Sequence, residues 1–298
     1  MVVVRLFDHE THQRHKNLSL TIFVCIGVLR GKIATCRSNS MITTESILIG
    51  MPMPKLSLRT LLLLFFGFGI VLTFVCQVIF PIREQARRCS CSNNIRQVTL
   101  ALLNCESVYE QLPIGIETSP DGSPYRSWRA HILPFLESNP TSYDPNSAWN
   151  SKPNTRFYDG TFGSWPEVWY CPSDSTKRVN YAVVVGTETA FPPNQNVNLD
   201  EITDGLENTI LVVETLSGSD KWTEPRDLQF DSMPFVISNS KNGEIGSKHP
   251  SGAYAGFADG EVHFITDAIS PEELRALLTI AGNEPITRQQ LIDRGVIR

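Results

Sequence analysis

The stretch TLLLLFFGFGIVLTFVCQVIFPI, residues 60–82, decides the fold, because it is almost purely apolar and contains no charged residue. As one helix, these 23 residues span roughly 35 Å at about 1.5 Å per residue, and the hydrocarbon core of a bilayer is about 30 Å thick. The run is also longer than the apolar region of about 7–15 residues in a cleaved signal peptide. The sequence therefore predicts a membrane anchor over residues 51–82, with lipid contact through residues 60–82.

An amphipathic pattern follows the anchor without a break. Apolar side chains recur at alternating spacings of three and four, as on one face of a helix, at Ile95, Val98, Leu102, Cys105 and Tyr109. Apart from Pro81, no Gly or Pro interrupts the chain until Pro113. We therefore expect a stalk helix over residues 83–112 that continues the anchor and bends at Pro81.

The remaining chain divides into a short leading part and a long trailing part. Residues 113–298 are numerous enough for one sizeable core and are expected to form a globular head. Residues 1–50 contain an apolar run that is too short to span a bilayer, and Met51 offers a later start. We expect residues 1–50 to be a non-native or disordered extension.

Charge is distributed unevenly along the sequence. Residues 1–112 carry 12 Lys and Arg against 6 Asp and Glu, whereas the head carries 14 against 25, a net charge of −11. A head this acidic repels the phosphate backbone, so nucleic acid is excluded as an expected partner. Four cysteines follow the anchor, which permits disulfides if the head lies in an oxidising compartment. We expect one pass through the cytoplasmic (inner) membrane, with the C-terminal head periplasmic or extracellular.

Short strand-like runs separated by turn residues fill the head. Residues 181–186 and 208–214 are rich in β-branched side chains and predict buried strands. Asp259-Gly260 lies between two further strand-like runs, which predicts a hairpin with a type I′ turn. Residues 127–136 predict a short amphipathic helix.

The C-terminal end carries two helix-start signals. Ser270 and Glu273 form one capping-box pattern, and Thr287 and Gln290 form a second. The fold class that follows is α+β, with a long N-terminal helix (membrane span plus amphipathic stalk) packed on an antiparallel sheet and with C-terminal helices.

Five short motifs occur in a fixed order along the chain. They are RRCSCSNNIRQ at residues 87–97, SWR at 127–129, CPSD at 171–174, ITDG with NTI at 202–210, and His249 followed by Asp259-Gly260. This set resembles the planctomycete pilin-like family of unknown function, over roughly residues 56–298. Members of that family combine a prepilin-type N-terminal segment with a C-terminal His-x9-Asp-Gly signature.

The resemblance implies a pilin or type II secretion pseudopilin architecture and a structural or assembly role, with other pilin-like subunits or secretion machinery as partners. It implies structural roles for the signature residues His249, Asp259, Gly260, Asp204, Gly205 and Asn208. Cys91 and Cys171 match positions at which family members carry cysteines, so the resemblance also implies a disulfide between them.

The N-terminal segment departs from the prepilin pattern. Where a prepilin has Gly before the cleavage point and Glu at the fifth mature position, this chain has Lys55 and Thr60. In a shifted frame the two positions hold Arg59 and Leu64. The alternative is therefore a monomeric, membrane-anchored recognition module that binds a glycan or a protein.

Catalytic chemistry has weak support in the sequence. His249 could act with Asp259 or His263, with His131, Glu214 or Asp204 as further partners, in a metal-dependent hydrolase. No HExxH motif, nucleophile elbow or Gly-rich phosphate loop accompanies them. The acidic loop around Asp204 is expected to be a solvated surface instead of a calcium site. We expect no enzyme activity, no catalytic or metal site and no cofactor.

Overall fold

The computed structural model describes residues 57–137, 143–155, 167–176, 178–238 and 245–298. Leu58–Arg298 forms one compact unit. The extension predicted over residues 1–50, and the first part of the predicted anchor, lie outside the described residues.

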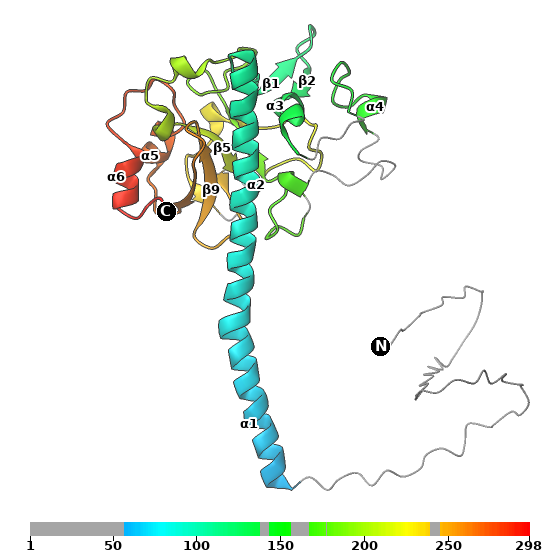
Figure 1. The fold of residues 1–298 in the computed structure, drawn as a ribbon, viewed down its shortest axis with the longest axis vertical. Helices are drawn as coiled ribbons and strands as arrows, with labels where there is room; N and C mark the ends of the chain where they lie inside the picture. Colours follow the sequence, from blue (N-terminus) through cyan, green and yellow to red (C-terminus); the bar gives the residue numbers. More distant parts are fainter. Residues whose placement is uncertain (1–56, 138–142, 156–166, 177, 239–244) are drawn as a thin grey trace, which may run out of the picture. The chain divides into compact units, whose positions relative to one another are not determined.

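One helix of 52 residues begins this unit, as Figure 1 shows. It consists of α1 (Leu58–Phe74), the π-helical turn η1 (Val75–Ile79) and α2 (Phe80–Tyr109). In the π turn the Phe80 N–H donates to the Val75 carbonyl, five residues back. Pro81 has no N–H and would crowd the carbonyl of Gln77 in a regular α-helix, and the wider turn relieves this conflict. The predicted continuity of anchor and stalk is confirmed. A π turn precedes Pro81, and the bend predicted at Pro81 stays a prediction.

The two parts of the helix differ in their surroundings. No residue of α1 is buried, and the continuous helix that begins with α1 is long and apolar enough to span a membrane. The buried face of α2 contains Ile95, Val98, Leu102 and Cys105, as the spacing predicts. Tyr109 is the exception, at 59% exposure, because the helix ends at the left-handed residue Glu110 and the Tyr109 ring packs edge-on against Phe135.

A four-stranded antiparallel sheet packs against α2. Its strand order is β10 (Val262–Thr266), β9 (Gly252–Phe257), β5 (Ile210–Glu214) and β3 (Tyr181–Ala182). The helix α2 contacts β5, β9 and β10, as Figure 1 shows for the first two. The predicted α+β class, with a long N-terminal helix on an antiparallel sheet, is confirmed.

Three two-stranded pairs surround the main sheet. They are antiparallel β1 (Ile116–Thr118) with β2 (Pro124–Ser127), and parallel β4 (Val184–Val185) with β6 (Leu228–Gln229) and β7 (Ile237–Ser238) with β8 (Ile245–Gly246).

The strand predicted over residues 181–186 is divided between two sheets. At Val183 the N–H donates to the Asp227 carboxylate and the carbonyl accepts from the Leu228 N–H. Residues after Ala182 therefore pair with β6, and only the first two residues stay in the main sheet.

The hairpin between β9 and β10 forms as predicted, but its turn is not type I′. Gly260 has a positive φ of 87°, whereas Asp259 is absent from the described non-glycine residues with positive φ. The Gly260 N–H donates to the Phe257 carbonyl, so Ala258 and Asp259 are the central turn residues. Gly260 follows them in the left-handed position that a G1 bulge requires.

Short helices complete the head. Pro134 divides the predicted segment 127–136 into α3 (Trp128–His131) and a 3-10 turn (Leu133–Phe135). The helices α5 (Pro271–Ala276) and α6 (Arg288–Asp293) begin with the two predicted capping boxes. Others are α4 (Lys152–Thr155) and the 3-10 turns Glu167–Trp169, Leu199–Glu201, Leu206–Asn208 and Phe230–Ser232.

Candidate functional site

Four buried side chains from separate elements meet beside α2. They are Cys91 on α2, Cys171 in the loop after Glu167–Trp169, Glu214 at the end of β5 and His249 in the loop between β8 and β9. Their sulfur, oxygen and nitrogen ligand atoms all lie within 4.8 Å of one another. Each of the four residues is at most 2% exposed. We call this group the Cys–His–Glu cluster.

The start of α2 holds the loop that carries His249. Glu84, Arg88 and Cys91 lie on one helix face, at spacings of four and three. The Glu84 Oε1 lies 2.6 Å from the His249 Nδ1, and the Arg88 Nη2 donates to the Pro250 carbonyl at 2.7 Å. The first turns of α2 after the apolar segment therefore bind the loop at two adjacent residues.

Asn180 positions the loop that carries Cys171. The Asn180 Oδ1 accepts from the Cys171 N–H at 2.9 Å. Its Nδ2 donates to the Asp174 carboxylate at 3.0 Å and to the Thr215 carbonyl at 3.3 Å. One side chain thus ties the CPSD motif to the end of β5, which places Cys171 beside Glu214.

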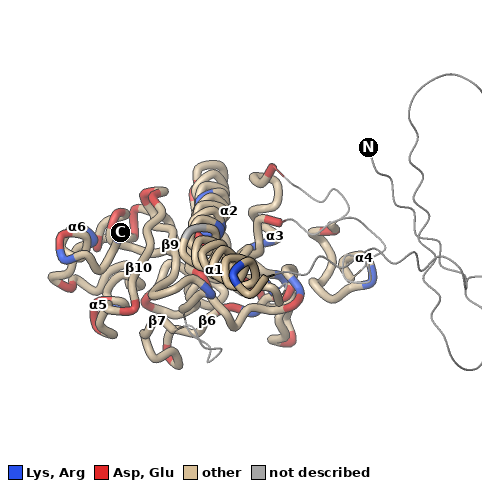
Figure 2. The backbone as a smooth tube through the Cα atoms, turned by 90° about the horizontal axis from the view of Figure 1, so that it is seen from below, with Lys and Arg blue, Asp and Glu red and all other residues tan. Residues whose placement is uncertain are grey.

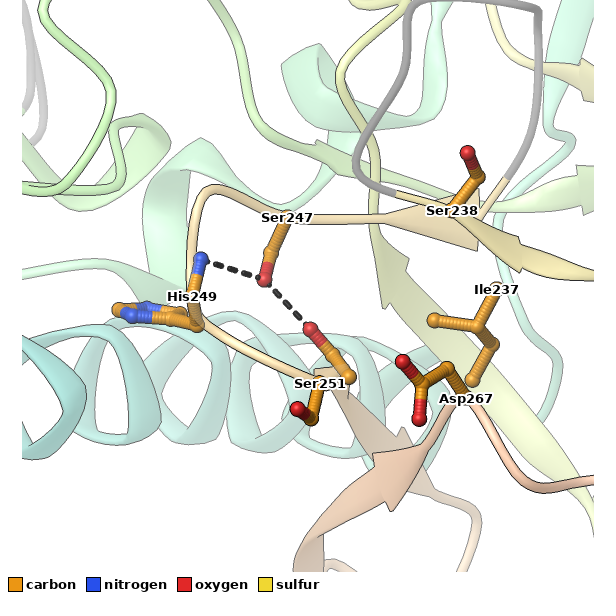
Figure 3. A pocket seen from close by; sticks show the side chains of 7 residues that line it. Ile237, Ser238, Ser247, His249, Ser251 and Asp267 are labelled. Carbon is orange, nitrogen blue, oxygen red and sulfur yellow. Dashed lines mark hydrogen bonds between the residues drawn. The ribbon is translucent and has the colours of Figure 1, made fainter.

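Hydrogen bonds within its own loop orient His249. The His249 N–H donates to the Ser247 Oγ at 3.0 Å, and the Ser247 hydroxyl donates to the Gly252 carbonyl at 2.7 Å, as Figure 3 shows. The same residues line one side of a polar cavity of about 170 Å³, and Asp267 lies on the other side. The imidazole points away from Asp267, so it is not directed into this cavity (Figure 3).

The two sulfur atoms of the cluster lie 2.6 Å apart, and both cysteines are free thiols in this structure. The Cys91 thiol donates to Cys171, and this bond raises the pKa of Cys91 and lowers the pKa of Cys171. The Cys171 Sγ also lies 3.3 Å from the His249 Nε2. Burial lowers the pKa of His249, but the bond to Cys171, the charge of Glu214 and the bond to Glu84 together raise it to about 9.

Glu214 contributes a carboxylate that is only half satisfied. Its Oε2 accepts from the Tyr254 N–H at 2.8 Å. Its Oε1 is buried and accepts no hydrogen bond from the described residues, and it lies 3.7 Å from the His249 Nε2. Burial, followed by the charge of Cys171, raises the pKa of Glu214 to about 8.

The other signature residues lie in a separate network at the C-terminal helices. The Asp204 carboxylate accepts from the N–H groups of Gly282 at 2.7 Å and Asn283 at 2.9 Å. The Asn208 Oδ1 accepts from the Arg288 N–H at 2.8 Å, and the Arg288 guanidinium pairs with Asp259. Both glycines of the signature take a left-handed φ, 97° at Gly205 and 87° at Gly260.

Of the residues that the sequence offered as partners of His249, one lies beside it and the others lie elsewhere. Glu214 lies beside it, whereas Asp204 and Asp259 are engaged with the C-terminal segment. The His131 Nε2 lies 3.4 Å from Glu117, and the His263 ring packs edge-on against Phe257. Neither of these histidines is in the Cys–His–Glu cluster.

Sequence reasoning missed Glu84, because its partner His249 is 165 residues away. The one available signal was its position on the same helix face as Cys91. It also missed the role of Arg129 in the SWR motif, which is a buried ion pair with Asp227.

The disulfide between Cys91 and Cys171 stays a prediction. Closing a loop over a sequence separation of 80 residues would stabilise the fold by about 4 kcal/mol in the chain-entropy model. In protein isolated from an oxidising compartment and alkylated without reduction, peptide mapping should find these two cysteines linked. The control cysteines Cys89 and Cys105 should be alkylated, and a linkage that involves either of them would contradict the prediction.

Comparison with known proteins gives one family match. Residues 81–190 match the model of a family described as a protein of unknown function (DUF1559). The matched part runs from the start of α2 past β4, and it contains Cys91 and Cys171 but neither Glu214 nor His249. No curated protein and no solved structure matches the chain. The match supports the resemblance to a family of unknown function.

Proposed function

We propose that the chain is a single-pass protein of the cytoplasmic (inner) membrane and acts as a pilin- or pseudopilin-like structural or assembly subunit of a surface or secretion apparatus. Its head would lie on the periplasmic or extracellular side. The observation that carries the proposal is the division of one continuous helix, which is apolar and fully unburied in α1 and packed on an antiparallel sheet in α2.

The first part of the helix supports membrane attachment. Large apolar side chains are exposed all around α1, including Leu63 at 72%, Phe66 at 72% and Ile70 at 58%. A helix that is apolar on every side is stable in a bilayer or in a protein core, and none of the described residues buries α1. This exposure supports the proposed lipid contact over residues 60–82.

The charge and the signature residues support a structural role. Acidic positions are found on both sides of the helix in the head, as Figure 2 shows, and the head's net charge of −11 disfavours nucleic acid as a partner. The proposal includes no enzyme activity. Two of the signature carboxylates, Asp204 and Asp259, bind the C-terminal segment, which supports a structural role for them.

Membrane attachment is tested by charged substitutions in the two parts of the helix. The double variant Phe66→Arg/Ile70→Arg should release most of the protein from carbonate-washed membranes, because each central Arg costs about 2.5–3.5 kcal/mol on insertion scales. The matched control Leu100→Arg/Val108→Arg changes exposed residues of α2 and should stay in the membrane fraction. Release of the unmodified chain by carbonate would overturn the anchor.

Assembly is tested on the unmodified chain in intact membranes. Formaldehyde treatment should give a ladder of chain multiples on a denaturing gel, and the ladder should vanish when the membranes are dissolved in excess detergent before treatment. A monomer band alone would reject the assembly role. It would favour the alternative, a monomeric anchored module that recognises a glycan or a protein, which the departure at Lys55 and Thr60 suggests.

A further inference from the structure

We propose that, when both thiols are reduced, Cys91, Cys171, Glu214 and His249 bind one Zn²⁺ ion. This site is independent of the proposed assembly role. It rests on the donor atoms, the unsatisfied carboxylate oxygen and the orientation of the imidazole.

The donor set selects the metal. Two sulfurs, one imidazole nitrogen and one carboxylate oxygen make four donors, all of which are ligands of Zn²⁺ in proteins. Thiolate donors disfavour Mg²⁺ and Ca²⁺, which prefer oxygen ligands. Four protein ligands leave no open position for water or substrate, which is typical of a structural zinc site.

The buried Oε1 atom of Glu214 lacks a hydrogen bond. None of the described residues donates to it, and the His249 Nε2 faces it at 3.7 Å, an ion-pair distance that is too long for a hydrogen bond. A polar group buried without a partner costs about 1–3 kcal/mol, and more when it is charged. A cation at the centre of the cluster would satisfy this oxygen and compensate the charges of the thiolates.

His249 is oriented as a metal ligand would be. Its Nδ1 bonds to the Glu84 carboxylate at 2.6 Å, which leaves the Nε2 facing Cys171 and Glu214. Histidines that bind zinc commonly donate their second ring nitrogen to a carboxylate, which fixes the tautomer and the ring plane. Glu84 is thus a positioning residue for the site.

The required adjustment is small. Two sulfurs bound to one tetrahedral Zn²⁺ at about 2.3 Å lie roughly 3.8 Å apart. The present Sγ–Sγ distance is 2.6 Å, so the two side chains must separate by roughly 1 Å. The predicted disulfide uses the same two sulfurs, so the disulfide and the zinc site are alternative states of one pair.

The test uses the full chain in detergent micelles with a non-thiol reductant. Residues 1–50 contain three closely spaced histidines, at positions 9, 12 and 15, which could bind zinc themselves. Every protein tested therefore carries His12→Ala/His15→Ala. Bound metal is first removed with a chelator, and the chelator is then removed by buffer exchange. Titration with Zn²⁺ in competition with a zinc indicator should then give one bound ion per chain. Co²⁺ in its place should give the thiolate charge-transfer and tetrahedral ligand-field bands.

Variants separate the site from adventitious binding. Cys91→Ser/Cys171→Ser should abolish stoichiometric binding, and Glu84→Gln should weaken it about 10–100-fold, as expected for an orienting carboxylate. Cys105→Ser changes another buried cysteine of α2 and should leave the affinity unchanged.

Thermal unfolding of each variant without metal verifies the fold, and zinc should raise the midpoint only where the site is intact. The proposal is overturned if the reduced chain binds no zinc, or if the double cysteine variant binds it with the original affinity.

Discussion

Replacing Asp227 by alanine should lower the free energy of unfolding of the head by about 3–5 kcal/mol, the usual cost of removing one partner of a buried ion pair. The Asp227 side chain is fully buried and pairs with Arg129, whose side chain is 2% exposed. The two make a bidentate contact, with N–O distances of 2.8 and 3.1 Å. Asp227 also accepts from the Trp128 indole and the Val183 N–H. Its loss would leave a buried guanidinium without its counter-charge and two further donors without this acceptor.

Urea unfolding of the full chain in micelles, followed by near-ultraviolet circular dichroism, measures this change. The matched control is Asp220→Ala, which removes an exposed partner of Arg178 and should cost less than about 1 kcal/mol. Arg129→Met/Asp227→Leu removes both charges together and should recover part of the loss. If Asp227→Ala and Asp220→Ala lowered the free energy of unfolding equally, the ion pair of Arg129 and Asp227 would not be the stabilising contact that we infer.

Replacing Gly256 by valine should destabilise the head by about 3 kcal/mol, at the upper end of the cost of overpacking a core. A Cβ atom at this position would lie 1.9 Å from the Thr99 Oγ1 of α2 and 3.0 Å from the Val212 Cγ1 of β5. Thr99 cannot move away freely, because its hydroxyl donates to the Ile95 carbonyl at 2.8 Å. The helix would therefore have to move away from the sheet.

A rescue variant distinguishes this contact from a general effect of losing glycine. Thr99→Ala/Gly256→Ala should be more stable than Gly256→Ala alone, because the clashing oxygen is removed. Gly67→Ala is a neutral control, since a Cβ atom there meets no atom within 4 Å. The same urea experiment applies, and an unchanged midpoint in Gly256→Val would show that helix and sheet do not approach this closely.

Local signals were enough to predict much of the fold. The unbroken apolar run predicted α1, the spacing of Ile95 and Val98 predicted the buried face of α2, and two capping boxes predicted the starts of α5 and α6. Each of these features depends on residues that are close to one another in one continuous segment of the chain, so the local sequence is enough to predict it.

Features that depend on distant partners could not be predicted. The strand that begins at Tyr181 ends after two residues because the next N–H, that of Val183, donates to Asp227, 44 positions after Val183. The turn at Asp259 is a local feature that the dipeptide alone does not settle: Asp-Gly fits a type I′ turn, but it fits equally a turn in which only Gly260 has a positive φ, as found here. The Cys–His–Glu cluster brings together residues from the helix, a loop, a strand and a second loop, and no spacing rule connects them.

The π turn at Val75–Ile79 affects how the head is rotated about the helix axis relative to α1. A turn closed by a bond over five residues contains one residue more than an α-turn, and each residue of a helix advances the side chains by about 100°. The extra residue therefore rotates α1 relative to α2 by roughly 100° from its place in an uninterrupted α-helix. A neighbour in the bilayer that packs on one side of α1 would thus lie below a different side of the head than it would if the whole helix were a regular α-helix.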